Sequence, residues 1–369
     1  MKNLCFSLYN NILIKKIINI LLFVIAFIYL FMIVILIYIG PLETIFVKHK
    51  LRNNQIDIVV SFTTTPYRID KIKPVLESIE RQSIKPNRIY VNIPWKFKRE
   101  NIEYLIPTWL KNYPNIIINR TTDYGPATKL IATLEKEKDP NTIIITIDDD
   151  SIYPKHMVRE LAKQYLLESF QRVYQSSAVF TGFSLNFLFG PNYNLYAEHN
   201  VGSNKPSLLI IGAGGVAYKR NFFKDDIFVL LKNVPLYCFL SDDLMISAYL
   251  LANNITIIQA GGIYYNTYYV NLIKHLPTFS TKDALSQGAN NLAHGSNETN
   301  YCHCLDFLSK QPNTVKYQKV ILEKSKSIHT LYLSYNNFSN YTKQLFFYSL
   351  EEIVNFFPFM AQIVLLFIK

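Results

Sequence analysis

The amino-acid sequence predicts an α/β domain built around a mostly parallel β-sheet. Short apolar runs rich in β-branched residues, which are typical of buried strands, alternate along the chain with segments of helical periodicity. The strand-like runs are 56–62, 88–93, 115–119 and 142–147, and the helix-like segments are 69–82, 127–137 and 155–170. Elements that alternate in this way form a sheet with helices on its faces. Ligands of such sheets bind at the carboxyl ends of strands, and polar segments follow three of these runs.

Beyond residue 171 the pattern is mixed. Residues 207–220 predict a strand that enters a Gly-rich turn, 241–254 predict a helix, and 255–259 predict a further strand. Ser241 or Asp242 is expected to cap the helix.

An apolar segment near the N-terminus indicates a membrane anchor. Residues 17–39 are apolar apart from Asn19, and at about 1.5 Å per residue they are long enough to cross a bilayer. The segment ends at Gly40-Pro41 without the small residues of a cleavage site, so we expect it to be retained. Lys15 and Lys16 lie closest to it, which favours a cytosolic N-terminus and a non-cytosolic domain, as in a Golgi or ER lumen; a cytosol-facing domain is the alternative.

The chain therefore divides into five predicted parts. The last of them is apolar but contains Pro358 and Gln362 and is short for a span, which favours a helix that packs on the domain or lies at the membrane surface. The parts are an N-terminal tail (1–16), the anchor (17–39), a stem (40–55), the α/β domain (56–312) and a C-terminal helical extension (313–369).

Composition limits the possible partners. The chain has 38 Lys and Arg residues against 27 Asp and Glu residues, a net charge of +11. The basic residues occur singly or in pairs, so we expect no nucleic-acid partner; an anionic membrane surface or a phosphorylated substrate fits better. Four cysteines are too few for a disulfide scaffold, and Cys302 and Cys304 lack zinc-site spacing. The cysteines are therefore expected to be ordinary thiols or to form one disulfide. In an oxidising compartment Cys238 and Cys302 are a candidate pair.

Three adjacent aspartates, Asp148, Asp149 and Asp150, follow the run at 142–147. In an extended chain the first and third point to one side and the second to the other. Two carboxylates on one side of a strand end suit a divalent cation, which in turn can hold a diphosphate. The alternative is that Asp150 or Ser151 caps the helix that begins near Pro154, but one cap requires at most one aspartate.

Two basic side chains and a further aspartate follow the other strand-like runs. Arg68 comes after the first run, and its guanidinium fork suits a phosphate or a base carbonyl. Lys129 lies in the first turn of a predicted helix, where backbone amides favour phosphate. Asp123 either contacts the nucleotide or caps the turn. Both basic residues could equally be solvated surface side chains.

Five short motifs occur in a fixed order within residues 56–310. They are Thr65 to Arg68, Asp148 to Asp150, Ile211-Gly212-Ala213, Asp242-Asp243, and His294 followed by Tyr301-Cys302. This order resembles that of the glycosyltransferases of GT-A fold, and in particular the exostosin-like glycosyltransferase domains. The resemblance implies a Rossmann-like GT-A domain behind the predicted transmembrane helix.

The resemblance also implies roles for individual residues. Asp150 is similar to the direct metal ligand, with Asp148 beside it at the metal and Asp149 towards the ribose. Thr65 and Arg68 correspond to donor-nucleotide contacts, and His294 to a donor-phosphate contact for which His275 is a rival. Asp243 or Asp242 is the candidate catalytic carboxylate, as the base of an inverting enzyme or beneath the anomeric carbon in a retaining one. The cofactor would be Mn²⁺ or Mg²⁺.

The expected activity is transfer of a hexosyl or N-acetylhexosaminyl group from a nucleotide-diphospho-sugar, with UDP as the nucleotide, to a glycan or lipid-linked acceptor. A metal-dependent phosphotransferase or nuclease would also use clustered carboxylates, and an inactive glycan-binding protein could keep the same fold. A dinucleotide-binding turn is matched by Gly212, Gly214 and Ala217. However, residues 218–226 have a poor helical pattern, and the acidic residue that would bind the ribose about 20 positions further on is missing.

Overall fold

The structure, a computed structural model, describes a defined part of the chain. The described residues are 41–166, 177–180, 184–189, 195–200, 207–210, 212–259, 274–275 and 297–324, together with Ile20, Phe23 and Phe27. Contacts divide the chain into two units, Met1–His49 and Lys50–Lys369, and residues 41–53 are helical. The tail 1–16, most of the predicted anchor 17–39 and the end of the extension, 325–369, lie outside the described residues. Within the described part, none of the helices has the length and apolarity required to cross a bilayer.

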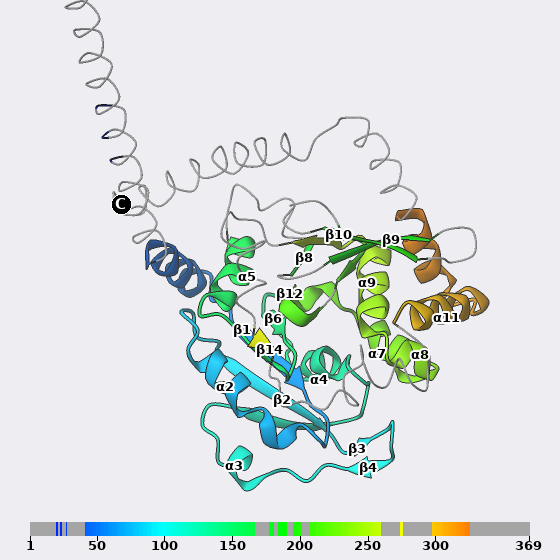
Figure 1. Ribbon diagram of the computed structural model, residues 1–369, viewed down its shortest axis with the longest axis horizontal. Coiled ribbons are helices and arrows are strands. Elements are labelled where there is room, and N and C mark those ends of the chain that lie inside the picture. Colours follow the sequence, from blue (N-terminus) through cyan, green and yellow to red (C-terminus); the bar gives the residue numbers. More distant parts are fainter. Residues whose placement is uncertain are drawn as a thin grey trace, which may run out of the picture. The chain divides into compact units, whose positions relative to one another are not determined.

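A mostly parallel seven-stranded sheet forms the centre of the second unit, which confirms the predicted α/β class (Figure 1). The strand order is β13-β8-β12-β6-β1-β2-β5, and β12 alone is antiparallel to its neighbours β6 and β8. The strands are β1 Ile58–Thr63, β2 Arg88–Pro94, β5 Ile117–Thr121, β6 Ile143–Thr146, β8 Ser177–Phe180, β12 Val216–Lys219 and β13 Thr256–Gln259. The four predicted strand-like runs are β1, β2, β5 and β6, and β1 is buried on both faces.

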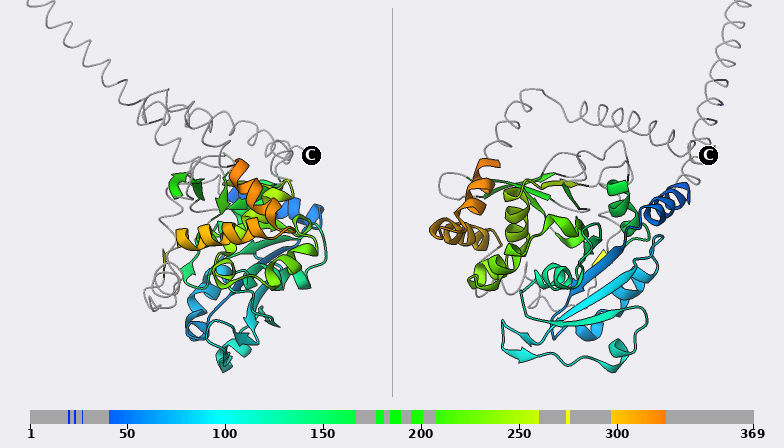
Figure 2. Two further views of the ribbon diagram at one scale, coloured as in Figure 1. Left: turned by 90° about the vertical axis from the view of Figure 1, so that its right-hand side faces the viewer. Right: turned by 180° about the vertical axis from the view of Figure 1, so that it is seen from behind.

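Smaller strand pairs and helices surround this sheet (Figures 1 and 2). The helices are α2 Lys73–Glu80, α3 Thr108–Lys111, α4 Thr128–Lys136, α5 Met157–Leu166, α7 Asp226–Lys232, α8 Leu236–Phe239, α9 Asp242–Ala252 and α11 Asn297–Lys310. The minor strands are β3 Lys96–Phe97, β4 Ile102–Glu103, β7 Ser151–Ile152, β9 Ser184–Phe189, β10 Leu195–Asn200, β11 Leu209–Ile210 and β14 Lys274–His275, and short 3₁₀ turns are Ile69–Lys71, Gly212–Gly214 and Arg220–Phe222. Residues 315–324 are also helical, and Tyr317 from this helix stacks on Tyr249 of α9.

The chain reverses its direction of travel across the sheet at β1. From β1 it proceeds to β2 and β5 on one side, and then returns to β6 on the other side of β1. The carboxyl ends of β1 and β6 therefore form a topological switch point, where ligands of open α/β sheets bind.

A buried polar network fixes α4 on this sheet. The Asn92 amide donates to the Ser61 hydroxyl at 2.8 Å and to the Thr133 hydroxyl at 3.0 Å, and the Asn119 amide donates to the Asn92 carbonyl at 2.8 Å. The Ser61 hydroxyl also donates to the backbone carbonyl of Lys129. Because each of these buried groups has a partner, the network specifies one position for α4, and with it the position of Lys129.

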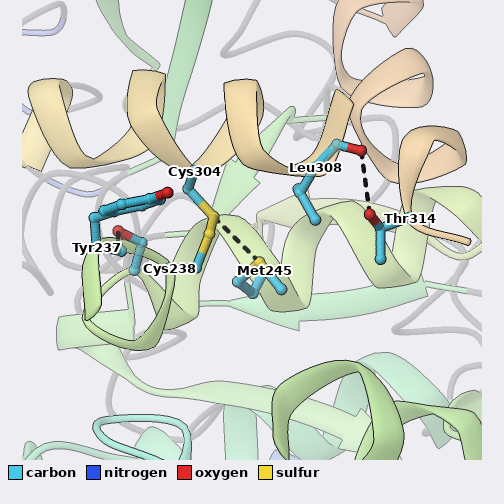
Figure 3. Close-up of a disulfide and its surroundings, with 7 residues drawn as sticks. Tyr237, Cys238, Met245, Cys304, Leu308 and Thr314 are labelled. Carbon is cyan, nitrogen blue, oxygen red and sulfur yellow. Dashed lines mark hydrogen bonds between the residues drawn. A yellow bond between two sulfur atoms is a disulfide. The ribbon is translucent and has the colours of Figure 1, made fainter. Parts of the chain in front are cut away.

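A disulfide joins α8 to α11, next to the helix that carries the second acidic motif (Figure 3). Cys238 pairs with Cys304, and not with Cys302, which the sequence offered as a candidate partner. The reason is helical geometry: residues two apart in α11 point about 200° from each other, so only one of the two cysteines can face α8. Cys304 is buried, and its sulfur lies 3.4 Å from the Met245 sulfur of α9. In the left view of Figure 2 the orange α11 lies alongside the green helices of this region.

We expect Cys304→Ser to destabilise the protein by about 2–4 kcal/mol, because the bridge closes a long loop between residues that are 66 positions apart. Thermal unfolding of the oxidised parent and variant measures this effect. Cys302→Ser is the matched control from the same helix and should change the midpoint much less. Equal shifts for the two variants would contradict the assigned pairing.

Candidate active site

The loop after β1 and the acidic turn after β6 meet at the switch point. Arg68 Nη1 lies 2.6 Å from Asp149 Oδ1 and 3.3 Å from Asp150 Oδ2. The Thr64 hydroxyl donates to Asp149 Oδ2 at 2.6 Å. The predicted convergence of these two polar segments is therefore confirmed, and Thr64 is an additional member that the sequence pattern did not single out.

The three aspartates alternate in exposure as a strand-like turn requires. The side chains of Asp148, Asp149 and Asp150 are 30%, 7% and 33% exposed, respectively. Burial raises the pKa of Asp149 to about 6, although the adjacent Arg68 guanidinium acts in the opposite direction. Asp149 thus anchors the turn internally, while Asp148 and Asp150 keep accessible oxygens on the other side.

A buried ammonium group connects the two acidic motifs. Lys129 Nζ lies 2.9 Å from Asp148 Oδ1 and 3.3 Å from Asp242 Oδ2, and the lysine side chain is 10% exposed. Burial by itself lowers the pKa of Lys129, but the nearby carboxylates of Asp148, Asp242 and Asp243 together raise it well above its ordinary value. Lys129 therefore stays charged and stabilises the carboxylates, and it is not a solvated surface lysine.

The two aspartates at the start of α9 have different environments. Asp242 is buried beside Lys129, whereas Asp243 is half-buried and receives a hydrogen bond from the Gly212 backbone N–H. Burial, and next the charge of Asp242, raise the pKa of Asp243 well above its ordinary value. Neither aspartate is the N-cap residue of α9, because Ser241 occupies that position. The Ser241 hydroxyl donates a hydrogen bond to the Tyr237 carbonyl at 2.6 Å. Asp243 is thus the more accessible of the two carboxylates.

Gly212 allows the Gly-rich turn to approach this cluster. A Cβ atom at this position would lie 3.2 Å from Lys129 Nζ and 3.4 Å from Asp243 Oδ1. A side chain there would therefore press on the ion pairs, so glycine at position 212 favours the close approach of this turn.

Tyr153 is a member of the site that the sequence analysis missed. Its hydroxyl accepts a hydrogen bond from the Asp148 backbone N–H at 2.8 Å and donates to the Ala213 carbonyl at 3.2 Å. Burial raises its pKa well above the ordinary value, so the hydroxyl remains protonated and can donate. No motif marks this tyrosine, because its role arises only when the acidic turn and the Gly-rich turn lie side by side.

Four further residues were predicted for the site, and the structure describes three of them. The Asp123 carboxylate accepts hydrogen bonds from the backbone N–H of Lys98 at 2.8 Å and of Gly125 at 2.7 Å. Asp123 therefore caps the turn, which is the second of its two expected roles. The buried Thr65 hydroxyl oxygen has no hydrogen-bond partner within the described part of the chain. His294 lies outside the described residues. The rival His275 is placed by backbone pairing of β14 with β7, in register with Ser151 and so next to the acidic turn.

The residues at the switch point include carboxylate oxygens, the type of ligand that a hard divalent cation prefers. Within the described residues no group of three or more His, Cys, Asp or Glu side chains is arranged to hold an ion. The reason is that Asp148 and Asp150 face different cations, Lys129 and Arg68. The carboxylates of the two acidic motifs nevertheless outnumber these cations, and the side chains of Asp148 and Asp150 are about one third exposed. Hard oxygen donors with unused capacity are what Mn²⁺ or Mg²⁺ requires.

We expect Lys129→Met to reduce the free energy of unfolding by about 3–5 kcal/mol, because it leaves buried carboxylates without their counter-ion. Chemical unfolding measures the loss. Mn²⁺ should raise the melting temperature of this variant more than that of the parent, since the carboxylates then have no internal cation. Lys136→Met, at the exposed end of the same helix, is the matched control and should change stability by about 0.5 kcal/mol or less. Equal stability of the two variants would contradict the assigned role of Lys129.

Comparisons with known proteins give only distant similarities. No protein-family model matches the sequence, and no curated protein matches it. The fold resembles that of 4-diphosphocytidyl-2C-methyl-D-erythritol synthase from Anaerococcus prevotii, with 14% identity and a TM-score of 0.31 over 58% of this chain and 90% of that chain. It also resembles residues 1–349 of S. aureus TarS, crystallised with UDP, with 12% identity and a TM-score of 0.35 over 78% of this chain and 77% of that chain. Likenesses this distant say nothing about the ligands of the present chain.

Proposed function

We propose that this protein is a metal-dependent glycosyltransferase. It transfers a hexosyl or N-acetylhexosaminyl group from a nucleotide-diphospho-sugar, with UDP as the expected nucleotide, to a glycan or lipid-linked acceptor. The observation that carries the proposal is the meeting of two acidic motifs at the topological switch point of an α/β sheet, joined by Lys129. The order of the motifs supports the finer assignment to an exostosin-like domain.

The donor diphosphate would bind at the half-exposed oxygens of the acidic turn. Asp150 and Asp148 would hold Mn²⁺ or Mg²⁺, which when bound offsets the negative charge that develops on the leaving diphosphate. Arg68 and Thr65 follow β1 next to the acidic turn, and they remain the expected nucleotide contacts; the buried Thr65 hydroxyl has no hydrogen-bond partner within the described residues. His275 is a candidate phosphate contact because β14 lies beside the acidic turn, and His294 keeps the same expected role.

Asp243 is the proposed catalytic carboxylate. It is more accessible than Asp242, and its raised pKa makes it a stronger base than an ordinary aspartate. In an inverting reaction Asp243 would accept the proton of the acceptor hydroxyl, while the sugar leaves the diphosphate. In a retaining reaction it would lie beneath the anomeric carbon and stabilise the positive charge there. Asp242, held by Lys129, positions its neighbour.

The disulfide supports a non-cytosolic location for the domain. Bridges such as Cys238–Cys304 persist in oxidising compartments and are rare in the cytosol. This agrees with the expected single-pass anchor at 17–39 with its N-terminus in the cytosol, and we propose a domain that faces a Golgi or ER lumen.

We expect Asp243→Asn to lower kcat by about 10²–10⁴-fold, because the amide cannot accept a proton or stabilise positive charge as a carboxylate does. The donor dissociation constant should change only a few-fold, since Asp243 is not a proposed donor ligand. Steady-state kinetics and donor titration separate the two effects. Asp225→Asn replaces the exposed aspartate at the N-cap of α7, whose side chain forms no cap hydrogen bond, and serves as the control. Full turnover in Asp243→Asn would contradict this catalytic role, whereas absence of turnover in the parent would favour the inactive binding protein instead.

We expect the fitting nucleotide-sugar to stabilise the protein by about 2.7 kcal/mol at 100 times its dissociation constant, and only with Mn²⁺ or Mg²⁺ present. A panel of nucleotide-sugars tested by thermal unfolding, with and without EDTA, measures this. Asp150→Asn should weaken the metal response. If no nucleotide-sugar changes the melting temperature or is hydrolysed with or without manganese, the transferase proposal fails. Hydrolysis of phosphodiesters without a sugar donor would point to the phosphotransferase alternative.

A further inference from the structure

The sequence Asn-x-Ser/Thr, which accepts an N-linked glycan in the lumen of the secretory pathway, occurs five times in the chain. The five asparagines are Asn119, Asn254, Asn297, Asn337 and Asn340. A motif this short also arises by chance in a chain rich in asparagine, so the motif alone assigns no glycan. The structure gives the exposure of two of the five, Asn119 and Asn254, and their environments are opposite.

Asn119 belongs to the interior of the domain. It is 4% exposed, and its amide nitrogen donates to the Asn92 side-chain oxygen at 2.8 Å and to the Ala132 backbone carbonyl at 3.3 Å. An amide nitrogen carries two hydrogens, so both are already used. A glycan would replace one of them and would need an open path to solvent. A chain with a glycan on Asn119 could not form the network that holds α4 on the sheet, which excludes this position.

Asn254 lies exposed in the turn between α9 and β13. Its backbone N–H donates to the Leu251 carbonyl at 3.1 Å, and the N–H of Ile255 donates to the Leu250 carbonyl at 2.9 Å. The φ of Asn254 is +60°, a conformation that asparagine and aspartate adopt more readily than most side chains. The acceptor asparagine is therefore on an ordered and accessible turn, and Thr256 is the third residue of its motif.

The turn at Asn254 lies at the end of the sheet that faces away from the acidic turn. β13 runs parallel to β8, and β12 is antiparallel to both β8 and β6, so β13 has the same direction as β6. The start of β13 is therefore opposite the carboxyl end of β6. α9 separates the two places as well: its 11 residues, about 16 Å in length, lie between Ser241 and Asn253. A glycan on Asn254 thus leaves the candidate active site open.

We propose that Asn254 carries an N-linked glycan and that Asn119 does not. The inference rests on the proposed non-cytosolic location of the domain, and it goes beyond the proposed function because it assigns a covalent modification. The donor is an oligosaccharide linked to a lipid diphosphate, which a transferase of the lumen supplies. Its anomeric carbon forms a bond to the Asn254 amide nitrogen, the bond to the lipid diphosphate breaks, and one amide proton is released.

The test uses the full chain expressed in mammalian cells, whose secretory pathway attaches such glycans. A peptide N-glycosidase applied in heavy-oxygen water converts each glycosylated asparagine to a labelled aspartate, and peptide mass spectrometry locates the label. We expect the label at position 254 in most copies and none at position 119. Asn254→Asp keeps a residue that tolerates the positive φ, and it should lose one glycan, seen as one step in gel mobility, with donor hydrolysis unchanged.

Pro235→Thr is the control for the side of the membrane on which the domain lies. It completes a new acceptor sequence at the exposed Asn233, and threonine is among the residues favoured at this N-cap position of α8. A glycan at Asn233 or elsewhere in the chain with none at Asn254, or a glycan at Asn119 in the folded protein, would overturn the proposal and leave the proposed location in place. No glycan at any position would overturn both. Donor hydrolysis is measured separately, because its presence or absence tests the transferase function whatever the glycan does.

Discussion

The buried ammonium of Lys129 is the interaction on which the rest of the site depends. It lies between Asp148 and Asp242, which come from motifs almost a hundred positions apart, and it makes their approach favourable where repulsion would otherwise separate them. A charge in this position is stable only because its partners compensate the loss of water. Its placement in turn depends on α4, which the Ser61, Asn92 and Thr133 network holds against β1 and β2.

This arrangement changes how a cation would bind at the acidic turn. The sequence pattern suggests that the carboxylates are neutralised by a bound metal. In the structure two basic side chains of the protein already pair with them, Arg68 with Asp150 and Lys129 with Asp148. Asp149 is committed to Arg68 and Thr64, whereas Asp148 and Asp150 retain exposed oxygens. Under the proposed function, a diphosphate with its metal would have to share or replace part of this ion-pair network. Burial separates Asp149, which is held within the protein, from Asp148 and Asp150, which are the proposed ligands.

The second acidic motif is positioned by a different part of the fold. α9 begins at Asp242, four positions after the disulfide-bonded Cys238, and Tyr249 near its other end stacks on Phe223 and Tyr317. Asp243 is thus carried by a helix that is fixed at both ends, and the Gly212 turn can approach it closely. Such rigidity suits a carboxylate whose position relative to a reacting atom must be kept within a fraction of an ångström.

The sequence by itself determined the α/β class, the strands around β1 and the convergence of Arg68 with the aspartates, because apolar periodicity and the carboxyl-end rule depend on local residue order. It left Lys129 ambiguous between a phosphate contact and a surface lysine, and it left the partner of Cys238 open. Tyr153 and Thr64 had no local signal at all. Tertiary structure decided these points, because the burial of a charge, the face of α11 that turns to α8 and the neighbours of a hydroxyl depend on residues far apart in the chain.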